Sequence, residues 1–113
     1  MPNTTAIDAA VACAKQAGLC FVKCVDENRP SCAKICHDTS DLCWALAAYL
    51  SRDAHGTDAL ADATADLCLA CATECEQHDA DHCRKTAVAA RAAAAAFGRQ
   101  AETTPRTPSG ERL

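Results

Sequence analysis

Apolar and small residues return every three or four positions along most of this chain, with polar residues between them. This period is typical of one face of an α-helix, whereas strict alternation would indicate a strand. Turn-forming residues interrupt the pattern and divide it into segments. The pattern therefore predicts four helices, at about residues 4–26, 30–52, 57–77 and 80–97.

Residues near the predicted helix ends support these boundaries. Thr4 or Thr5 is expected to cap the first helix, because a hydroxyl oxygen accepts a hydrogen bond from a free backbone N–H of the first turn. Asn28 or Ser31 is expected to cap the second helix, with Pro30 near its first position. Helices of similar length joined by short turns predict an all-α fold, an antiparallel up-down-up-down four-helix bundle.

The length of 113 residues fits a single domain. We expect the bundle to occupy residues 1–98 and the polar, proline-bearing residues 99–113 to form a flexible tail. The N-terminus has no basic segment followed by an apolar run, and we expect no segment long enough to span a membrane. These features predict a cytoplasmic protein without a membrane partner.

Composition excludes several classes of function. The net charge of −4, with a single tryptophan and a single tyrosine, disfavours a nucleic-acid partner, because phosphates attract cations and bases stack on aromatic rings. Cys36 and His37 are a weak catalytic pair, since adjacent helical residues point in different directions. The sequence therefore predicts a protein that is not an enzyme.

The cysteines are the strongest chemical signal in the chain. Ten occur in 113 residues, and within each predicted helix neighbouring cysteines are separated by three, four or seven positions. Residues at these offsets share one face of a helix, so the cysteines are expected to line the bundle core. The candidate metal ligands are Cys13, Cys20, Cys24, Cys32, Cys36, Cys43, Cys68, Cys71, Cys75 and Cys83.

This spacing favours a soft-metal site over a disulfide framework. Two cysteines four positions apart on a helix have Cβ atoms about 5–6 Å apart, which is too far for a disulfide. Bridges between helices stay open as the alternative. Thiolates bind Cu(I), Zn(II) or iron–sulfur clusters, whereas calcium and magnesium prefer oxygen. A zinc finger is disfavoured because the chain has a single CxxC motif, at residues 68–71 within a predicted helix.

Counting residues inward from the first and third turns predicts how deep each cysteine lies. Both turns lie at one end of an up-down-up-down bundle. A layer with one cysteine from every helix is expected nearest that end: Cys24, Cys32, Cys75 and Cys83. The deeper levels are expected to hold, in order, Cys20 with Cys36 and Cys71, then Cys68, then Cys13 with Cys43.

Two segments carry a resemblance to a known family. Residues 66–85 read DLCLACATECEQHDADHCRK, and residues 32–51 read CAKICHDTSDLCWALAAYLS. Both resemble helices of the four-helix-bundle, cysteine-rich copper-binding proteins, which include the cytosolic copper storage proteins. The resemblance covers about residues 6–97. It implies inward cysteines that bind Cu(I), loaded through an open end, and often an assembly of several bundles. The predicted function is therefore to bind and sequester Cu(I) for storage, buffering or detoxification.

The chain departs from that family in its fourth helix, where residues 85–96 contain no cysteine. This difference favours a smaller cluster gathered at one end, and it keeps two alternatives open. The four cysteines of the predicted end layer could instead hold a [4Fe-4S] cluster. The cysteines could also serve as small apolar core residues in a bundle without metal.

Two histidines near the same end are candidates for metal entry. His78 and His82 flank the third turn beside Cys83, where they could ligate an outer ion or be solvated turn residues. His37 and His55 are expected to be peripheral. Several apolar residues outside the cysteine stripes, with Trp44, suggest either a homo-oligomer or packing at the cysteine-poor end.

Overall fold

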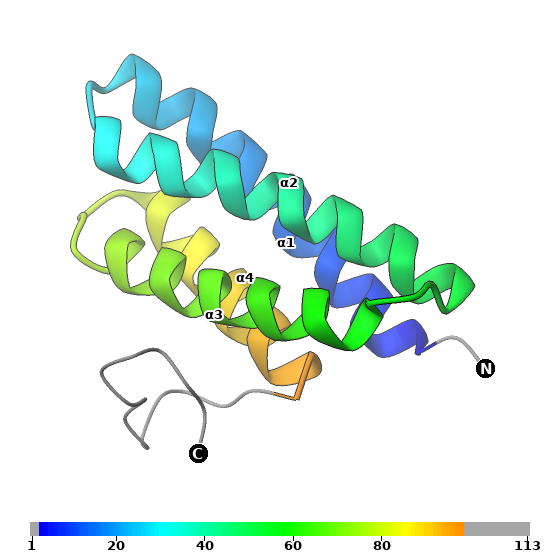
Figure 1. The fold of residues 1–113 in the computed structure, drawn as a ribbon. Coiled ribbons are helices and arrows are strands. Elements are labelled where there is room, and N and C mark those ends of the chain that lie inside the picture. Colours follow the sequence, from blue (N-terminus) through cyan, green and yellow to red (C-terminus); the bar gives the residue numbers. More distant parts are fainter. Residues whose placement is uncertain (1–2, 99–113) are drawn as a thin grey trace, which may run out of the picture.

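The structure, a computed structural model, describes residues 3–98, and these fold into four α-helices with no strand among them. The helices are α1 (Thr4–Asp26), α2 (Pro30–Arg52), α3 (Thr57–Cys75) and α4 (Asp81–Ala96) (Figure 1). The predicted all-α four-helix fold is confirmed. The expected tail, residues 99–113, lies outside the described residues.

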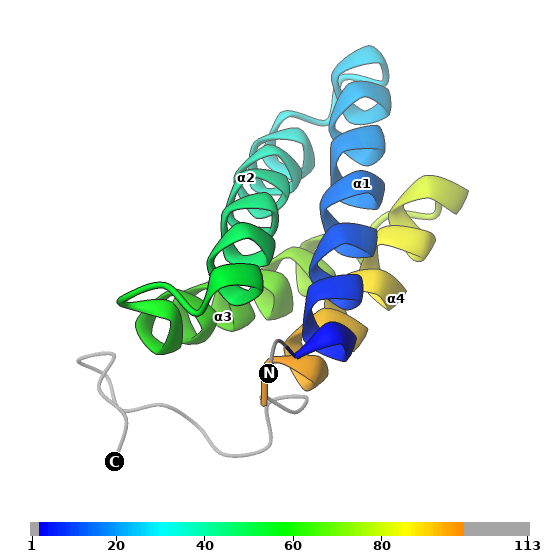
Figure 2. The ribbon, with the colours of Figure 1, turned by 90° about the vertical axis from the view of Figure 1, so that its right-hand side faces the viewer.

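Each helix packs against its neighbours in the chain, and α4 closes the bundle against α1. The diagonal pairs, α1 with α3 and α2 with α4, make no close backbone contact within the part of the chain that the structure describes. The α1–α2 and α3–α4 turns lie at the same end of the molecule, and the two hairpins are inclined to one another (Figures 1 and 2). We call this end, formed by residues 27–29 and 76–80, the cysteine end.

Two expected helix caps were wrong, although the helix boundaries were close. Asn3, not Thr4 or Thr5, caps α1, and its Oδ1 accepts a hydrogen bond of 3.1 Å from the Ala6 N–H. Asn28 ends α1 instead of capping α2, because its φ of 58° is in the left-handed region that Asn tolerates better than most residues. The backbone N–H of Arg29 then reaches the Cys24 carbonyl at 2.8 Å, which satisfies an otherwise free helix end.

The core is built from small side chains. Cysteines and alanines fill most of the buried positions, and Leu46 is the largest side chain that is fully buried among the described residues. On α4, buried alanines at Ala87, Ala90 and Ala94 take the inward positions that cysteines occupy on the other helices. Trp44 is 46% exposed, so it lies on the outer surface as the sequence suggests. A core this poor in large apolar groups leaves the thiols in contact with one another.

Helix α1 corrects one expectation, because by length and composition it is apolar enough to cross a membrane. Its buried cysteines, such as Cys13 and Cys20, raise its apolar content while facing the core. A core helix passes the same test, so this is weak evidence for a membrane span.

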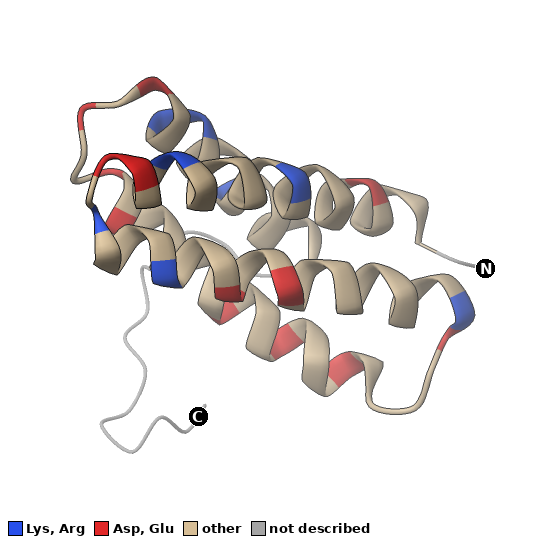
Figure 3. Ribbon diagram, turned by 90° about the horizontal axis from the view of Figure 1, so that it is seen from above, with Lys and Arg blue, Asp and Glu red and all other residues tan. Residues whose placement is uncertain are grey.

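Charged residues lie on the outside of the bundle. Acidic residues recur along α3, which contains no lysine or arginine (Figure 3). Glu76, just after α3, pairs with Arg91 on α4 through two hydrogen bonds of 2.7 Å each. This pair joins the α3–α4 hairpin across its outer surface.

Candidate metal centre

All ten cysteines point into the bundle core. Each has a relative exposure of 0%, and all are free thiols. The side chains come from every helix, because the spacing of three, four or seven keeps each set on the inner face. The core therefore contains a concentration of sulfur that no disulfide consumes.

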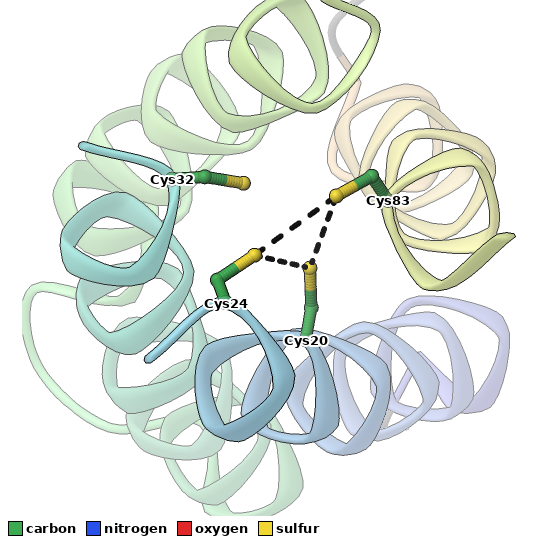
Figure 4. Close-up of side chains that lie close together, drawn as sticks. All are labelled: Cys20, Cys24, Cys32 and Cys83. Carbon is green, nitrogen blue, oxygen red and sulfur yellow. Dashed lines mark hydrogen bonds between the residues drawn. The ribbon is translucent and has the colours of Figure 1, made fainter. Parts of the chain in front are cut away.

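The first thiol group lies at the cysteine end. Its members are Cys20, Cys24, Cys32 and Cys83, whose sulfurs all lie within 4.8 Å of one another. Figure 4 shows these side chains converging from three helices. The distance is 3.7 Å from Cys20 Sγ to Cys24 Sγ and 3.9 Å from either sulfur to Cys83 Sγ. A tetrahedral ion with metal–sulfur bonds of about 2.3 Å needs sulfurs about 3.8 Å apart, so this group is nearly preformed.

The second thiol group lies beside the first and consists of Cys20, Cys32, Cys36 and Cys75. Cys75 Sγ is 3.7 Å from both Cys32 Sγ and Cys36 Sγ. Each of the two groups is built in the same way: an i, i+4 pair on one helix and one cysteine from each neighbouring helix. Cys20 and Cys32 belong to both groups, so their thiolates are placed to bridge ions in the two positions.

A third group lies deeper and has three members, Cys13, Cys43 and Cys68. Cys43 Sγ is 3.7 Å from Cys68 Sγ. The remaining cysteine, Cys71, is 3.9 Å from Cys36 Sγ and so adjoins the second group. The first two groups, which share members, and Cys71 therefore form a continuous path of thiols from the cysteine end, and the third group lies beyond it toward the middle of the bundle.

The predicted end layer is wrong in one member. Cys75 groups with Cys36 in the structure, and Cys20 takes its expected place beside Cys24 and Cys83. Cys75 meets the α1 thiol Cys20, which lies one helical turn further from the cysteine end than Cys24. The two hairpins are inclined to one another, so equal counts of residues from the two turns do not give equal depth in the bundle (Figures 1 and 2). The expected separate level for Cys68 is also wrong, because Cys68 groups with the deepest cysteines.

The thiols differ in how readily they lose a proton. Hydrogen bonds from Cys36 and Cys75 lower the pKa of Cys20 against the opposing effect of burial, with a further contribution from His82. Hydrogen bonds from Cys13 and Cys68 lower the pKa of Cys43. Cys36 and Cys68, which neighbour these thiolates, have raised pKa values because their thiols hydrogen-bond to the surrounding cysteines, and burial and the charge of nearby thiolates add to the effect. Each group thus favours one thiolate before metal arrives.

His82 lies against the first group, on the core side of α4. Its Nδ1 is 3.3 Å from Cys20 Sγ, and its Nε2–H donates a hydrogen bond of 2.8 Å to Glu27 Oε1. Burial alone would lower the pKa of His82, but the contacts with Cys20 and Glu27 outweigh burial and raise it. Arg29 adds a positive charge here, since its guanidinium donates to Cys83 Sγ at 3.7 Å. The mouth of the thiol path is therefore lined by titratable and charged groups.

The partners of His82 were missed in the sequence. Glu27 is 55 residues away and its position in a turn gave no signal. Gln16 and Thr86 also hold this part of α4: Gln16 Nε2 donates to Thr86 Oγ1 at 3.2 Å, and Thr86 donates to the His82 carbonyl at 2.7 Å. For Gln16 and Thr86, the available signal in the sequence was a polar residue on an otherwise apolar helix face.

The other histidines differ in position. His78 Nε2 lies 2.8 Å from Glu74 Oε2, at the cysteine end but outside the thiol-only groups. His37 and His55 are exposed, as expected, and the His37 ring packs against Phe21 with ring centroids 4.9 Å apart. Of the two predicted entry residues, His82 therefore contacts the first thiol group directly and His78 stands next to Cys32.

Comparison with known proteins identifies the family. The sequence matches the copper storage protein family over residues 2–102. The chain belongs to this family. Among curated relatives, the uncharacterized cysteine-rich protein YhjQ of Bacillus subtilis (strain 168) is 32% identical over 87 residues, covering 74% of this chain and 81% of YhjQ.

Solved structures of copper storage proteins have the same fold. The Cu(I)-bound copper storage protein BsCsp3 superposes with a TM-score of 0.83 and 27% identity, covering 90% of this chain and all of BsCsp3. Apo copper storage protein 3 from Bacillus subtilis gives a TM-score of 0.79 and 31% identity, over 83% of this chain and 93% of that protein. The predicted family, fold and Cu(I)-sequestering function of this copper storage protein are confirmed.

The alternative function, a [4Fe-4S] cluster, finds no support in the family. The geometry also disfavours it, because an iron–sulfur cube must fit between its four thiolates and hold them further apart than a single ion does. The sulfurs of both four-thiol groups lie within 4.8 Å of one another, which suits single ions with shared ligands.

Proposed function

We propose that all ten cysteines of this copper storage protein are Cu(I) ligands, and that copper enters at the cysteine end. The observation that carries this proposal is the sharing of Cys20 and Cys32 between two four-thiol groups. A thiolate has more than one lone pair and can bridge two soft ions. Shared thiolates therefore support several ions along the path, which a storage function requires.

Filling begins at the first group and proceeds inward. The deepest group contains Cys13, Cys43 and Cys68, and copper reaches it by exchange from thiolate to thiolate, through the second group and the adjoining Cys71. Alanines at Ala87 and Ala90 leave α4 without ligands past Cys83, so the copper content is lower than ligands on all four helices would allow.

His82 and His78 assist entry at this end. His82 is nearly buried against Cys20 and is the better placed of the two to accept an incoming ion or the proton that it displaces. His78 is about a quarter exposed, so it meets solvent before the thiols do.

A cytoplasmic location, a non-enzymatic role and the absence of nucleic-acid or membrane partners complete the proposal. Free thiols in contact with one another stay reduced in a reducing compartment, and this supports a cytoplasmic location for the protein. The copper cargo is consistent with storage without catalysis.

The outer surface supports association into a homo-oligomer. Leu19, Val22 and Val25 on α1 are each 50–55% exposed, and Trp44 and Val88 are also exposed. Large apolar side chains exposed together are typical of interfaces between subunits.

The test is anaerobic titration of the reduced protein with Cu(I) against a competing chelator. We expect several tightly held equivalents per chain and a matching release of protons, because thiols deprotonate on binding. A capacity of zero or one ion would contradict the multi-ion path.

A further inference from the structure

A mixed donor cluster lies beside the thiol-only groups at the cysteine end. Cys32 Sγ, a carboxylate oxygen of Glu74 and an imidazole nitrogen of His78 all lie within 4.8 Å of one another. Cys32 is on the first turn of α2, Glu74 is on the last turn of α3, and His78 follows in the α3–α4 turn. Three residues from two neighbouring helices and a turn thus present one sulfur, one oxygen and one nitrogen to a common point.

The chemistry of these donors differs from that of the copper path. Cu(I) is a soft ion and prefers sulfur, whereas Zn(II) is borderline and binds thiolate, imidazole and carboxylate together. The thiolate and the carboxylate carry two negative charges, which a divalent cation neutralises and a monovalent cation does not. Three protein ligands also leave a fourth tetrahedral position for water.

The geometry allows such an ion after a small adjustment. His78 Nε2 and Glu74 Oε2 are now 2.8 Å apart in a hydrogen bond. Around a tetrahedral zinc ion with Zn–N and Zn–O bonds of about 2.0–2.2 Å, the two atoms would lie about 3.3–3.5 Å apart. The Glu74 and His78 side chains are 26% and 25% exposed, so they can separate by this amount without disturbing the core. The cation would take the place of the proton that they share.

We propose that Cys32, Glu74 and His78 form a site for a borderline divalent cation of the Zn(II) class, which competes with Cu(I) for Cys32. The same Cys32 sulfur lies 3.7 Å from Cys75 Sγ and 3.9 Å from Cys36 Sγ in the second thiol group. Occupancy of the mixed site draws this thiolate toward the outside and adds positive charge beside the copper path. Each metal therefore weakens the binding of the other by the same factor.

The consequence is a coupling of the copper store to a second metal. When copper is scarce, the divalent ion holds Cys32 at the entrance. When Cu(I) arrives, its preference for sulfur recruits Cys32 into the two thiol groups and releases the divalent ion. This inference goes beyond copper storage, which would stand without it.

The first experiment counts zinc. The reduced apo protein is titrated anaerobically with Zn(II) against a chromophoric chelator, in parallel with Glu74→Gln and His78→Gln. Matched controls are Glu76→Gln, a carboxylate that pairs with Arg91 on the outer surface, and His55→Gln, an exposed histidine at the opposite end. Zinc that binds only to thiols is common to all five proteins, so it cancels in the comparison.

We expect both site variants to lose one zinc equivalent, or at least tenfold in its affinity, and both controls to match the unchanged protein. Circular dichroism confirms that each variant is folded. Equal zinc stoichiometry and affinity in all five proteins would overturn the site.

The second experiment measures the coupling. Zinc present during Cu(I) titration should lower the apparent Cu(I) affinity of the unchanged protein and of His55→Gln, with less effect on His78→Gln. An equal effect in His78→Gln would overturn the competition at Cys32. The Cu(I) capacity measured without zinc tests copper storage independently: normal capacity with no His78-dependent zinc would overturn the mixed site alone.

Discussion

The His82 Nδ1 atom lies 3.3 Å from Cys20 Sγ, which places an imidazole of α4 against the α1 thiol that both four-thiol groups share. Glu27 accepts a hydrogen bond from the other ring nitrogen and so leaves Nδ1 facing the sulfur. Contacts from Glu27 to His82 and from His82 to Cys20 thus connect the surface turn with the first thiol group. In the proposed filling order, Cys20 is therefore the thiol at which incoming copper and a displaced proton meet.

The first prediction concerns the proton affinity of Cys20. Replacing His82 by Gln removes a hydrogen bond that lowers the pKa of Cys20, so the earliest thiol ionisation should move to higher pH. Ultraviolet thiolate absorbance during a pH titration of the apo protein measures this shift. His37→Gln is the control, because His37 is exposed and packs against Phe21. An unchanged titration curve in His82→Gln would show that the cysteine neighbours alone set the ionisation.

The second prediction uses the shared sulfur. Cys20→Ser removes a ligand from both four-thiol groups, whereas Cys24→Ser removes a ligand from the first group only. Cys20→Ser should therefore lose more tightly bound Cu(I) in a chelator competition assay, by about one ion relative to Cys24→Ser if each complete group holds one ion. Equal losses would contradict the bridging role of Cys20.

The third prediction separates folding from metal binding. The reduced apo protein should stay mostly helical by circular dichroism, because its alanine-rich helices and buried thiols pack without an ion. Cu(I) should raise the melting temperature by mass action, with about 2.7 kcal/mol of stabilisation per site when free copper is 100 times the dissociation constant. A largely unfolded apo form would mean that copper holds the bundle together.

The fourth prediction tests the cysteine-poor half of the core. Leu46 is fully buried, so Leu46→Ala should destabilise the apo protein by about 2–5 kcal/mol through lost burial and a cavity. Chemical denaturation measures this free energy of unfolding, and the Cu(I) capacity should not change. Leu19→Ala is the matched control, since Leu19 is 50% exposed and its loss should cost much less. Equal destabilisation by both changes would contradict the packing described for α2.

The fifth prediction concerns pH and the outer ion pair. Hydrogen bonding to Arg91 lowers the pKa of Glu76 from its ordinary value of 4.5, so the pair contributes stability above that value and loses it as pH falls through the folded pKa. Both side chains are more than a third exposed, so Glu76→Gln should cost at most about 0.5 kcal/mol at neutral pH. The difference between the two proteins should begin to shrink near pH 4.5 and continue to shrink below it. A difference that is constant from pH 7 to pH 3 would argue against the pair.

Local periodicity was sufficient to predict much of this protein. The fold and the helix faces follow from the spacing of small and apolar residues, because residues three and four apart always share a helix face. Cys20 with Cys24, and Cys32 with Cys36, could be paired on that basis, and both pairs are in contact. The resemblance of residues 66–85 to copper-binding helices then pointed to the family.

Which sulfurs meet across helices was decided by tertiary structure alone. Equal distance from a turn placed Cys75 beside Cys24, but the inclination of the two hairpins puts Cys75 with Cys20, Cys32 and Cys36 instead. The contact of His82 with Glu27 likewise joins residues 55 positions apart, one of them in a turn. The spacing of residues along a helix is local, so it can be read directly from the sequence. The contacts of a side chain with other helices depend on how whole helices pack, and no local sequence pattern determines that packing.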